Sequence, residues 1–213
     1  MKLFVWDFHG VLEKGNEFAV QEVCNKVLAD FGIKRKVTLQ ECLDLYGKKW
    51  ADYFRYFAPH FDEEKILQIV FEATKYSLGK KIALKYIKPM DNAHDVLKKI
   101  IEKGHINIIM SNSSPESLDY FLKSVNIKDM FQYKYGADQH KRNTSEERSK
   151  EEWLKEFLQQ HKFDDMIVID DLHEGIDMGR RLGAITYHFN KNRKIKADAD
   201  YCITDLREVL KEL

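Results

Sequence analysis

Cysteine is scarce in this sequence, and the few cysteines present fit neither a disulfide framework nor a zinc site. Cys24, Cys42 and Cys202 are odd in number and widely separated along the 213 residues, whereas the cysteines of zinc sites come in close pairs. Isolated thiols of this kind are typical of proteins in a reducing compartment. We therefore expect a cytoplasmic protein whose cysteines are structural.

Excess charge and long apolar stretches are also missing. Lys plus Arg and Asp plus Glu number 35 each, so no net field favours nucleic acid or an anionic membrane surface. The apolar run near the N-terminus is too short for a signal sequence, and no stretch reaches the roughly 18 apolar residues of a membrane span. The sequence predicts a soluble protein with neither nucleic acid nor membrane as a partner.

The sequence does contain an alternation of strand-like and helix-like segments. Three apolar-rich runs, at residues 3–8, 106–110 and 166–169, each lead into polar residues, as central strands covered on both faces do. Weaker strand candidates lie at 184–189 and 201–204, and residues 206–213 have helical spacing. Such alternation predicts parallel strands joined by helical crossovers. The expected fold class is α/β, with a three-layer, Rossmann-like core around a central parallel sheet.

A segment of different character separates the first predicted strand from the second. Apolar residues recur at helical spacing within 18–28, 39–45 and 66–71, and no good strand is present. Gly15 and Pro89 are natural hinge residues on either side. We expect residues 1–14 and 88–213 to form the core and residues 15–87 to form an inserted all-helical lobe.

Polar side chains follow each of the three best strands. Asp7 lies at the end of the first, Ser111 and Asn112 follow the second, and Asp170 and Asp171 follow the third. In an open parallel sheet ligands bind beyond the carboxyl ends of the strands, so these side chains should converge. Three carboxylates in one cleft repel one another unless a cation is bound, and oxygen ligands favour a hard ion. The sequence therefore predicts a Mg²⁺ site at this edge.

This set of residues suits attack by a carboxylate on phosphorus. An Asp side chain is ionised at neutral pH and needs no activating base, so Asp7 could form an aspartyl-phosphate that water then hydrolyses. A metal and a lysine would neutralise the phosphoryl oxygens, and backbone amides around Gly10 and Ser113 would help to hold them. Gly10 also permits a tight turn beside the phosphate.

Three motifs in this order resemble those of the haloacid dehalogenase superfamily, in its branch with a helical cap inserted after the first motif. Residues 7–12 (Asp-Phe-His-Gly-Val-Leu) resemble the first motif, and residues 108–114 (Ile-Ile-Met-Ser-Asn-Ser-Ser) resemble the second. Residues 169–171 (Ile-Asp-Asp), followed by residues 174–176 (Glu-Gly-Ile) and 182–184 (Leu-Gly-Ala), resemble the acidic fourth motif and the helix after it. The resemblance implies a Mg²⁺-dependent phosphatase in which residues 15–87 are the cap.

The resemblance also implies a role for each residue at the strand ends. Asp7 would be the nucleophile and a metal ligand, and the carbonyl of His9 would be a second metal ligand. Asp171 would bind the metal with support from Asp170. The phosphate would be bound by Gly10, Ser111 and Asn112.

The lysine of the third motif has two candidates. Lys150 opens a predicted helix over residues 151–160 and precedes Asp170 by twenty residues, and we favour it. Lys141 lies in a charged loop that could also fold inward.

His9 occupies the position at which phosphatases of this family usually carry a second Asp, which protonates the leaving oxygen. Histidine is a competent general acid and base near neutral pH, so the mechanism can survive with a different proton carrier. Alternatively, the imidazole is misplaced, and the protein is a catalytically weakened phosphate- or ligand-binding regulator. A dehalogenase also lacks the second Asp, but the pair Asp170 and Asp171 implies a metal that a dehalogenase would not need.

Substrate choice in capped members of the family is set by the cap. Gly47 interrupts a helical pattern and marks a turn, and the adjacent Lys48 and Lys49 could contact an anionic substrate. Trp50 could stack on a base or sugar, although it fits at least as well in the core of the lobe. The expected partner is a small phosphorylated metabolite such as a sugar phosphate or nucleotide, with a phosphotransferase or mutase as a weaker alternative.

Overall fold

The computed structural model describes residues 1–136, 149–190 and 197–213, and it divides the chain into two compact units. The first unit comprises Met1–Glu13 and Pro89–Leu213, and the second comprises Lys14–Lys88. A two-stranded sheet of β2 (Glu13–Lys14) and β3 (Lys88–Pro89) lies where the chain passes between the units. Every helix within the described ranges is too short or too polar to cross a membrane.

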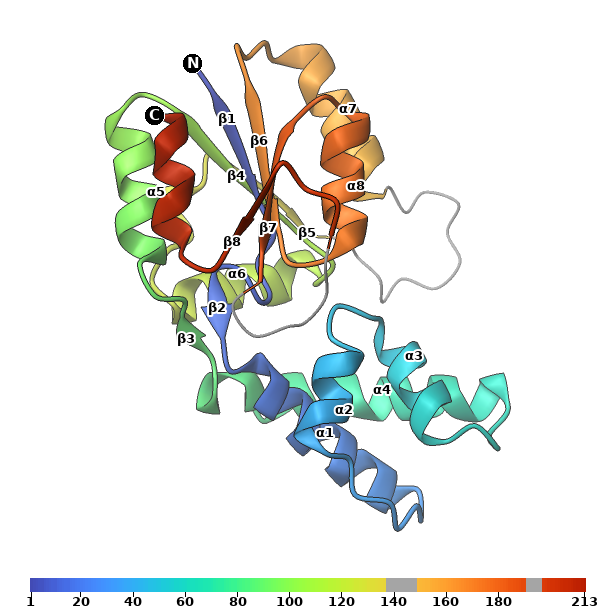
Figure 1. Ribbon diagram of the computed structural model, residues 1–213. Coiled ribbons are helices and arrows are strands. Elements are labelled where there is room, and N and C mark those ends of the chain that lie inside the picture. The colour runs from blue at the N-terminus through green and yellow to red at the C-terminus, as the bar shows by residue number, and fades with distance from the viewer. Residues whose placement is uncertain (137–148, 191–196) are drawn as a thin grey trace. The chain divides into compact units, whose positions relative to one another are not determined.

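The first unit is built on a six-stranded sheet whose strands all run parallel (Figure 1). In spatial order the strands are β5 (Tyr133–Gly136), β4 (Ile106–Ser111), β1 (Leu3–Trp6), β6 (Met166–Asp170), β7 (Ile185–Phe189) and β8 (Tyr201–Ile203). The strand β1 lies between β4 and β6, with Trp6 opposite Ile109 and Ile169. The carboxyl ends of the three strands predicted most firmly therefore meet at one edge.

Helices cover both faces of this sheet, because the inner strands are apolar on both faces. In Figure 1, α5 (Ala93–Glu102) and the C-terminal 3₁₀ helix η3 (Leu206–Glu212) lie on one side, and α7 (Lys150–Gln160) and α8 (His173–Arg181) lie on the other. Leu3 and Val5 of β1 are buried in one cluster with Leu154 and Phe157 of α7. The remaining elements of this unit are α6 (Pro115–Ser124) and η2 (Lys128–Met130). The predicted three-layer α/β core is confirmed.

The opposite face of the sheet contains a buried polar side chain, Asn107 of β4. Its Oδ1 accepts a hydrogen bond from Trp6 Nε1 at 3.0 Å, and its Nδ2 donates to the carbonyl of Leu97 on α5 at 3.1 Å. Because the amide is satisfied on both sides, its burial carries little desolvation cost. The contact fixes the register between β1, β4 and α5.

The second unit is helical, and it contains one α-helix and one short 3₁₀ helix more than the three patterns in the sequence. It comprises α1 (Asn16–Asp30), α2 (Leu39–Asp44), α3 (Trp50–Phe57), α4 (Glu63–Gly79) and the short η1 (Ile82–Lys85). The additional α-helix is α3. Gly47 adopts a φ of 81° in the turn before α3, a conformation that glycine tolerates and that explains the break in the helical pattern. Trp50 stacks on Phe54, so this aromatic side chain belongs to the packing of the helical unit.

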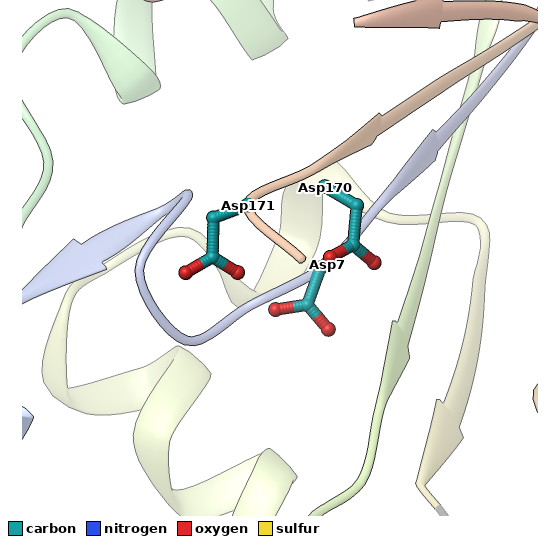
Figure 2. Close-up of side chains that lie close together, drawn as sticks. All are labelled: Asp7, Asp170 and Asp171. Carbon is teal, nitrogen blue, oxygen red and sulfur yellow. The ribbon is translucent and has the colours of Figure 1, made fainter. Parts of the chain in front are cut away.

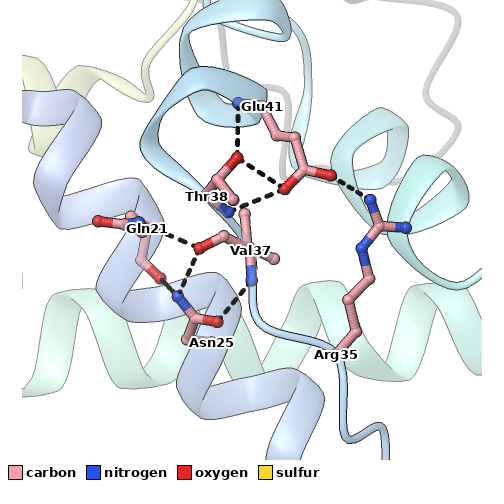
Figure 3. Close-up of polar contacts among 6 residues, drawn as sticks. All are labelled: Gln21, Asn25, Arg35, Val37, Thr38 and Glu41. Atoms are coloured by element: carbon pink, nitrogen blue, oxygen red, sulfur yellow. Dashed lines mark hydrogen bonds and ion pairs between the residues drawn. The ribbon is translucent and has the colours of Figure 1, made fainter.

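Polar contacts fix the connection between α1 and α2 (Figure 3). Asn25 of α1 accepts from the backbone N–H of Val37 at 2.8 Å and donates to its carbonyl at 3.1 Å. Thr38 then caps α2, where the Thr38 hydroxyl accepts from Glu41 N and the Glu41 carboxylate accepts from Thr38 N. Capping of this kind satisfies backbone donors that the helix leaves open. The helical unit is thus held by specific contacts of its own.

Candidate active site

Three carboxylates converge at the carboxyl edge of the parallel sheet (Figure 2). Asp7 follows β1, Asp170 ends β6 and Asp171 follows it. The two strands are neighbours, and Asp7 N donates to the carbonyl of Ile169 at 3.0 Å. Oxygen atoms of the three carboxylates all lie within 4.8 Å of one another. Among the described residues, this is the group of acidic, histidine or cysteine side chains arranged so that it could hold a metal ion.

Lys150 brings a positive charge into this cluster. Its Nζ lies 2.5 Å from Asp7 Oδ1 and 3.9 Å from Asp170 Oδ2. Lys150 is the first residue of α7, and Ser149 caps that helix, with its hydroxyl accepting from Glu152 N at 3.2 Å. Burial by itself would lower the pKa of Lys150, but the charges of Asp7 and Asp170 outweigh it and leave the pKa raised. The lysine therefore carries its charge at the site.

The carboxyl group of Asp170 is buried and closely surrounded. Burial raises the pKa of this carboxyl, the charge of Asp7 raises it further, and the charge of Lys150 opposes the rise. Its Oδ1 accepts from Leu172 N at 2.9 Å. On its other side lies Gly175 of α8, where a Cβ would stand 1.9 Å from Asp170 Oδ2. The absence of a side chain at residue 175 is what leaves room for the Asp170 carboxylate.

Asp171 is held through its backbone by a buried histidine on the neighbouring strand. Nε2 of His188 in β7 lies 3.1 Å from the carbonyl oxygen of Asp171, and His188 is fully buried. A carbonyl only accepts, so Nε2 carries the proton of this hydrogen bond. The sequence analysis assigned no role in the site to His188, and it noted Gly175 only as part of the helix after the acidic motif. In each case the signal was an unusual residue in a regular element, namely an imidazole in a buried strand and a glycine inside a helix.

The turn after Asp7 places His9. The carbonyl of Phe8 accepts from Val11 N at 3.4 Å and from Leu12 N at 3.0 Å, and Gly10 adopts a φ of 84°. This tight turn is the one expected of Gly10. The ring nitrogens of His9 lie within hydrogen-bonding distance of Glu13 and Ser113. The role of the His9 carbonyl as a metal ligand stays a prediction.

The end of β4 supplies hydroxyl groups beside this turn. Ser111 is buried, and its Oγ accepts from Ser113 N at 3.2 Å, whereas Asn112 is exposed. Ser114 caps α6, which begins at Pro115. The amide of Gly10 also has an acceptor within the protein, Glu13 Oε1 at 3.2 Å. Both amides expected to hold a phosphate thus already donate internally, so their part in phosphate binding stays a prediction.

The predicted roles of three other lysines are not tested by the contacts described above. Lys48 and Lys49 are exposed in the helical unit, between α2 and α3. Their contact with a substrate stays a prediction. Lys141, the alternative to Lys150, lies outside the described residues.

The donor set suits a hard divalent cation. Asp7, Asp170 and Asp171 offer carboxylate oxygens only, and the cluster of three negative charges and one lysine would leave an excess of negative charge if all four groups were ionised. Oxygen ligands of this kind are those that Mg²⁺ prefers. The residues present therefore fit the ion that the sequence predicted.

Solved structures share this fold over its whole length. A haloacid dehalogenase-like hydrolase from Streptococcus pneumoniae is 16% identical, with 99% of this chain and 97% of that chain covered and a TM-score of 0.81. A predicted phosphoglycolate phosphatase from Haemophilus somnus is 14% identical, with coverage of 100% and 97% and a TM-score of 0.81. A predicted phosphatase from Clostridium acetobutylicum is 16% identical, with coverage of 99% and 97% and a TM-score of 0.80.

At such low identities these structures show the fold alone, and no curated protein matches the chain. The family is shown by a sequence model. The model of the haloacid dehalogenase-like hydrolases matches residues 4–188, a range that includes the three carboxylates, Lys150 and the whole helical unit. The chain belongs to the haloacid dehalogenase-like hydrolases.

Proposed function

We propose that this protein is a Mg²⁺-dependent phosphomonoesterase that acts in the cytoplasm on a small phosphorylated metabolite, of the sugar phosphate or nucleotide class. The observation that carries the proposal is the position of Asp7, with its carboxylate 2.5 Å from Lys150 Nζ and in one cluster with Asp170 and Asp171. A pure structural role would not require three acidic side chains and a lysine at the carboxyl edge of the sheet.

The chemistry assigned to Asp7 is nucleophilic. Its carboxylate oxygen attacks phosphorus, the bond from phosphorus to the leaving oxygen breaks, and His9 protonates that oxygen. Water then attacks the aspartyl-phosphate, giving its proton to His9 and releasing phosphate from Asp7. Lys150 stabilises the phosphoryl oxygens throughout. Mg²⁺, held by Asp7, Asp170, Asp171 and the His9 carbonyl, would add positive charge at the same oxygens.

In this proposal the helical unit is the cap, and it sets the substrate. The segment between α2 and α3 carries two exposed cationic side chains, Lys48 and Lys49. Such side chains suit an anionic substrate, and capping of the site would exclude water from the aspartyl-phosphate until the leaving group departs.

A screen of phosphorylated metabolites tests the proposal. We expect phosphate release from at least one sugar phosphate or nucleotide, and from a generic aryl phosphate, in the presence of Mg²⁺. Chelation with EDTA should abolish release, and added Mg²⁺ should restore it. Phosphate release that persists in EDTA would contradict the metal assignment, and saturable ligand binding without turnover across the panel would contradict the phosphatase.

A second function, a weakened phosphate-binding protein, is favoured by one observation. Both ring nitrogens of His9 have partners within the protein, so the imidazole could be a structural group. Substitutions of His9 distinguish the two functions.

For the enzyme, we expect His9→Asn to lower kcat by about 10²-fold or more, the scale of general acid–base catalysis. His9→Asp should also lower kcat, because Glu13 Oε1 lies 3.0 Å from the ring position and would repel a second carboxylate. Steady-state rates at saturating Mg²⁺ measure both effects. A large gain with His9→Asp would instead show that histidine had weakened the site.

A further inference from the structure

Glu13 is a fully buried acidic residue that the family motif does not explain. Its Oε1 lies 3.0 Å from His9 Nδ1 and 3.2 Å from the backbone N of Gly10. Burying a carboxylate costs free energy unless it is hydrogen-bonded, so the contacts of Glu13 indicate what this burial is for. Both contacts are to residues 9 and 10, the segment that carries the proposed acid–base group.

The backbone brings Glu13 to His9 through the turn described above. The two hydrogen bonds to the carbonyl of Phe8 close one tight turn, and His9 and Glu13 form a parallel β-bridge with each other. The carboxylate therefore reaches His9 from a residue only four positions away.

The hydrogen bonds assign the proton on each ring nitrogen. An ionised carboxylate oxygen only accepts, and Glu13 Oε1 also accepts from the fixed N–H of Gly10, so His9 Nδ1 is the donor. In the neutral ring Nε2 is then an acceptor, and its partner is the hydroxyl of Ser113 at 3.1 Å. A hydroxyl can also accept, so the same contact serves when Nε2 is protonated.

Aromatic rings hold the imidazole in this orientation. The His9 ring lies at 70° to Phe8, with centroids 4.9 Å apart, and at 70° to Phe121 of α6, with centroids 5.2 Å apart. Phe8 and Phe121 are themselves parallel, with centroids 6.0 Å apart. A 180° flip of the ring about its Cβ–Cγ bond would put carbon atoms in place of both nitrogens and break both hydrogen bonds. The flipped ring would occupy the same space between the aromatic rings, so these rings restrict the tilt of the imidazole plane, and the hydrogen bond to Glu13 selects which way the ring faces.

We propose that Glu13 is a positioning residue that holds His9 with its proton on Nδ1 and makes Nε2 the atom that transfers protons. The catalytic part of this inference rests on the proposed phosphatase function. In the first step the proton on Nε2 passes to the leaving oxygen, and the ring becomes neutral. In the second step the same nitrogen takes a proton from the attacking water. The proton on Nδ1 stays in the hydrogen bond to Glu13 in both steps.

Two substitutions of Glu13 test the assignment. Glu13→Leu fills the buried position and removes the acceptor, whereas Glu13→Gln keeps an acceptor oxygen for Gly10 N and for Nδ1. We expect ¹⁵N chemical shifts of the neutral His9 ring, assigned by their loss in His9→Asn, to show the proton on Nδ1 in the wild type and Glu13→Gln. In Glu13→Leu the proton should move to Nε2. A wild-type ring with its proton on Nε2, or an unchanged tautomer in Glu13→Leu, would overturn the proposal.

Steady-state kinetics of the same variants distinguish a positioning role of Glu13 from a purely structural one. In Glu13→Leu we expect kcat to fall by about 10-fold or more with KM changed less than about 2-fold, because substrate binding is untouched while proton transfer is impaired. Glu13→Gln should recover most of kcat. Asp200→Asn is the matched control, since Asp200 accepts from Thr186 near the opposite end of β7, and it should leave kcat unchanged.

Folding of the variants is checked by thermal unfolding, and the ring signals are read only from folded protein. A Glu13→Leu variant that fails to fold is replaced by Glu13→Met, whose flexible side chain fills the same space without an acceptor oxygen. If the wild type releases no phosphate from any substrate, the phosphatase proposal fails, while the ¹⁵N shifts still decide whether Glu13 sets the tautomer. Equal kcat in the wild type and Glu13→Leu would overturn the catalytic part alone.

Discussion

Asp7→Asn is expected to lower kcat for phosphate release by about 10⁴-fold or more, the scale on which loss of a catalytic nucleophile acts in other hydrolases. The amide of Asn is nearly isosteric with the carboxylate but carries no charge and is a poor nucleophile towards phosphorus. It would also lose the ion pair with Lys150, whose Nζ lies 2.5 Å from Asp7 Oδ1. Single-turnover phosphate release at saturating Mg²⁺ measures the loss without interference from product release.

The control for Asp7→Asn is Asp177→Asn, which makes the same chemical change at an exposed position of α8. This control should retain wild-type kcat and KM. Asp7→Asn should remain folded, because the substitution preserves the volume of a side chain beside the strand end. An Asp7→Asn protein that keeps more than about a hundredth of wild-type kcat would sink the assignment of Asp7 as nucleophile.

The convergence of Asp7 with Asp170 and Asp171 could be predicted from the sequence because it depends on strand pairing. Buried parallel strands are apolar runs that end in polar residues, and their carboxyl ends share one edge. Once β1 and β6 are neighbours, the register with Trp6 opposite Ile169 places the carboxylates together. Local pattern and global fold agree at these residues.

Two elements could not be predicted in the same way. The strand β5 (Tyr133–Gly136) lies at the edge of the sheet, and its first residues are exposed, so it lacks the apolar run of a central strand. The helix α3 has only eight residues and follows the turn at Gly47, too short a segment to give a clear helical period beside α2. Both are set by tertiary packing.

The contacts of His9 could not be predicted from the sequence either, because they depend on the side-chain conformations in a tight turn. The only signal was Glu13 itself, a charged residue directly after the apolar pair Val11 and Leu12. A charge in that position is ordinarily solvated. Its complete burial becomes meaningful only when His9 and Gly10 are seen to be its partners.

Gly175→Ala, a substitution in α8, is expected to abolish most of the activity by displacing the carboxylate of Asp170. Ala is the better helix former, by about 1 kcal/mol, yet the added Cβ would stand 1.9 Å from Asp170 Oδ2 and 2.2 Å from its Cγ. Since Asp170 is buried, its carboxylate can escape only by leaving the cluster or shifting α8, and overpacking of this kind costs roughly 1–3 kcal/mol. We expect a lower thermal midpoint and a loss of kcat of about 10²-fold, on the scale of disturbed metal-site residues.

Two comparison variants separate the steric effect from helix propensity. Gly79→Ala makes the same change at the end of α4, where a Cβ would meet nothing within 4 Å, and it should be neutral or stabilising by up to about 1 kcal/mol. Combining Gly175→Ala with Asp170→Ala removes the side chain that the new Cβ would clash with. The double variant should therefore lose less unfolding free energy than the two single variants lose together, while its activity stays lost. If the two changes instead add in unfolding free energy, Gly175 is not present to make room for Asp170, and the cluster owes its geometry to the strand ends alone.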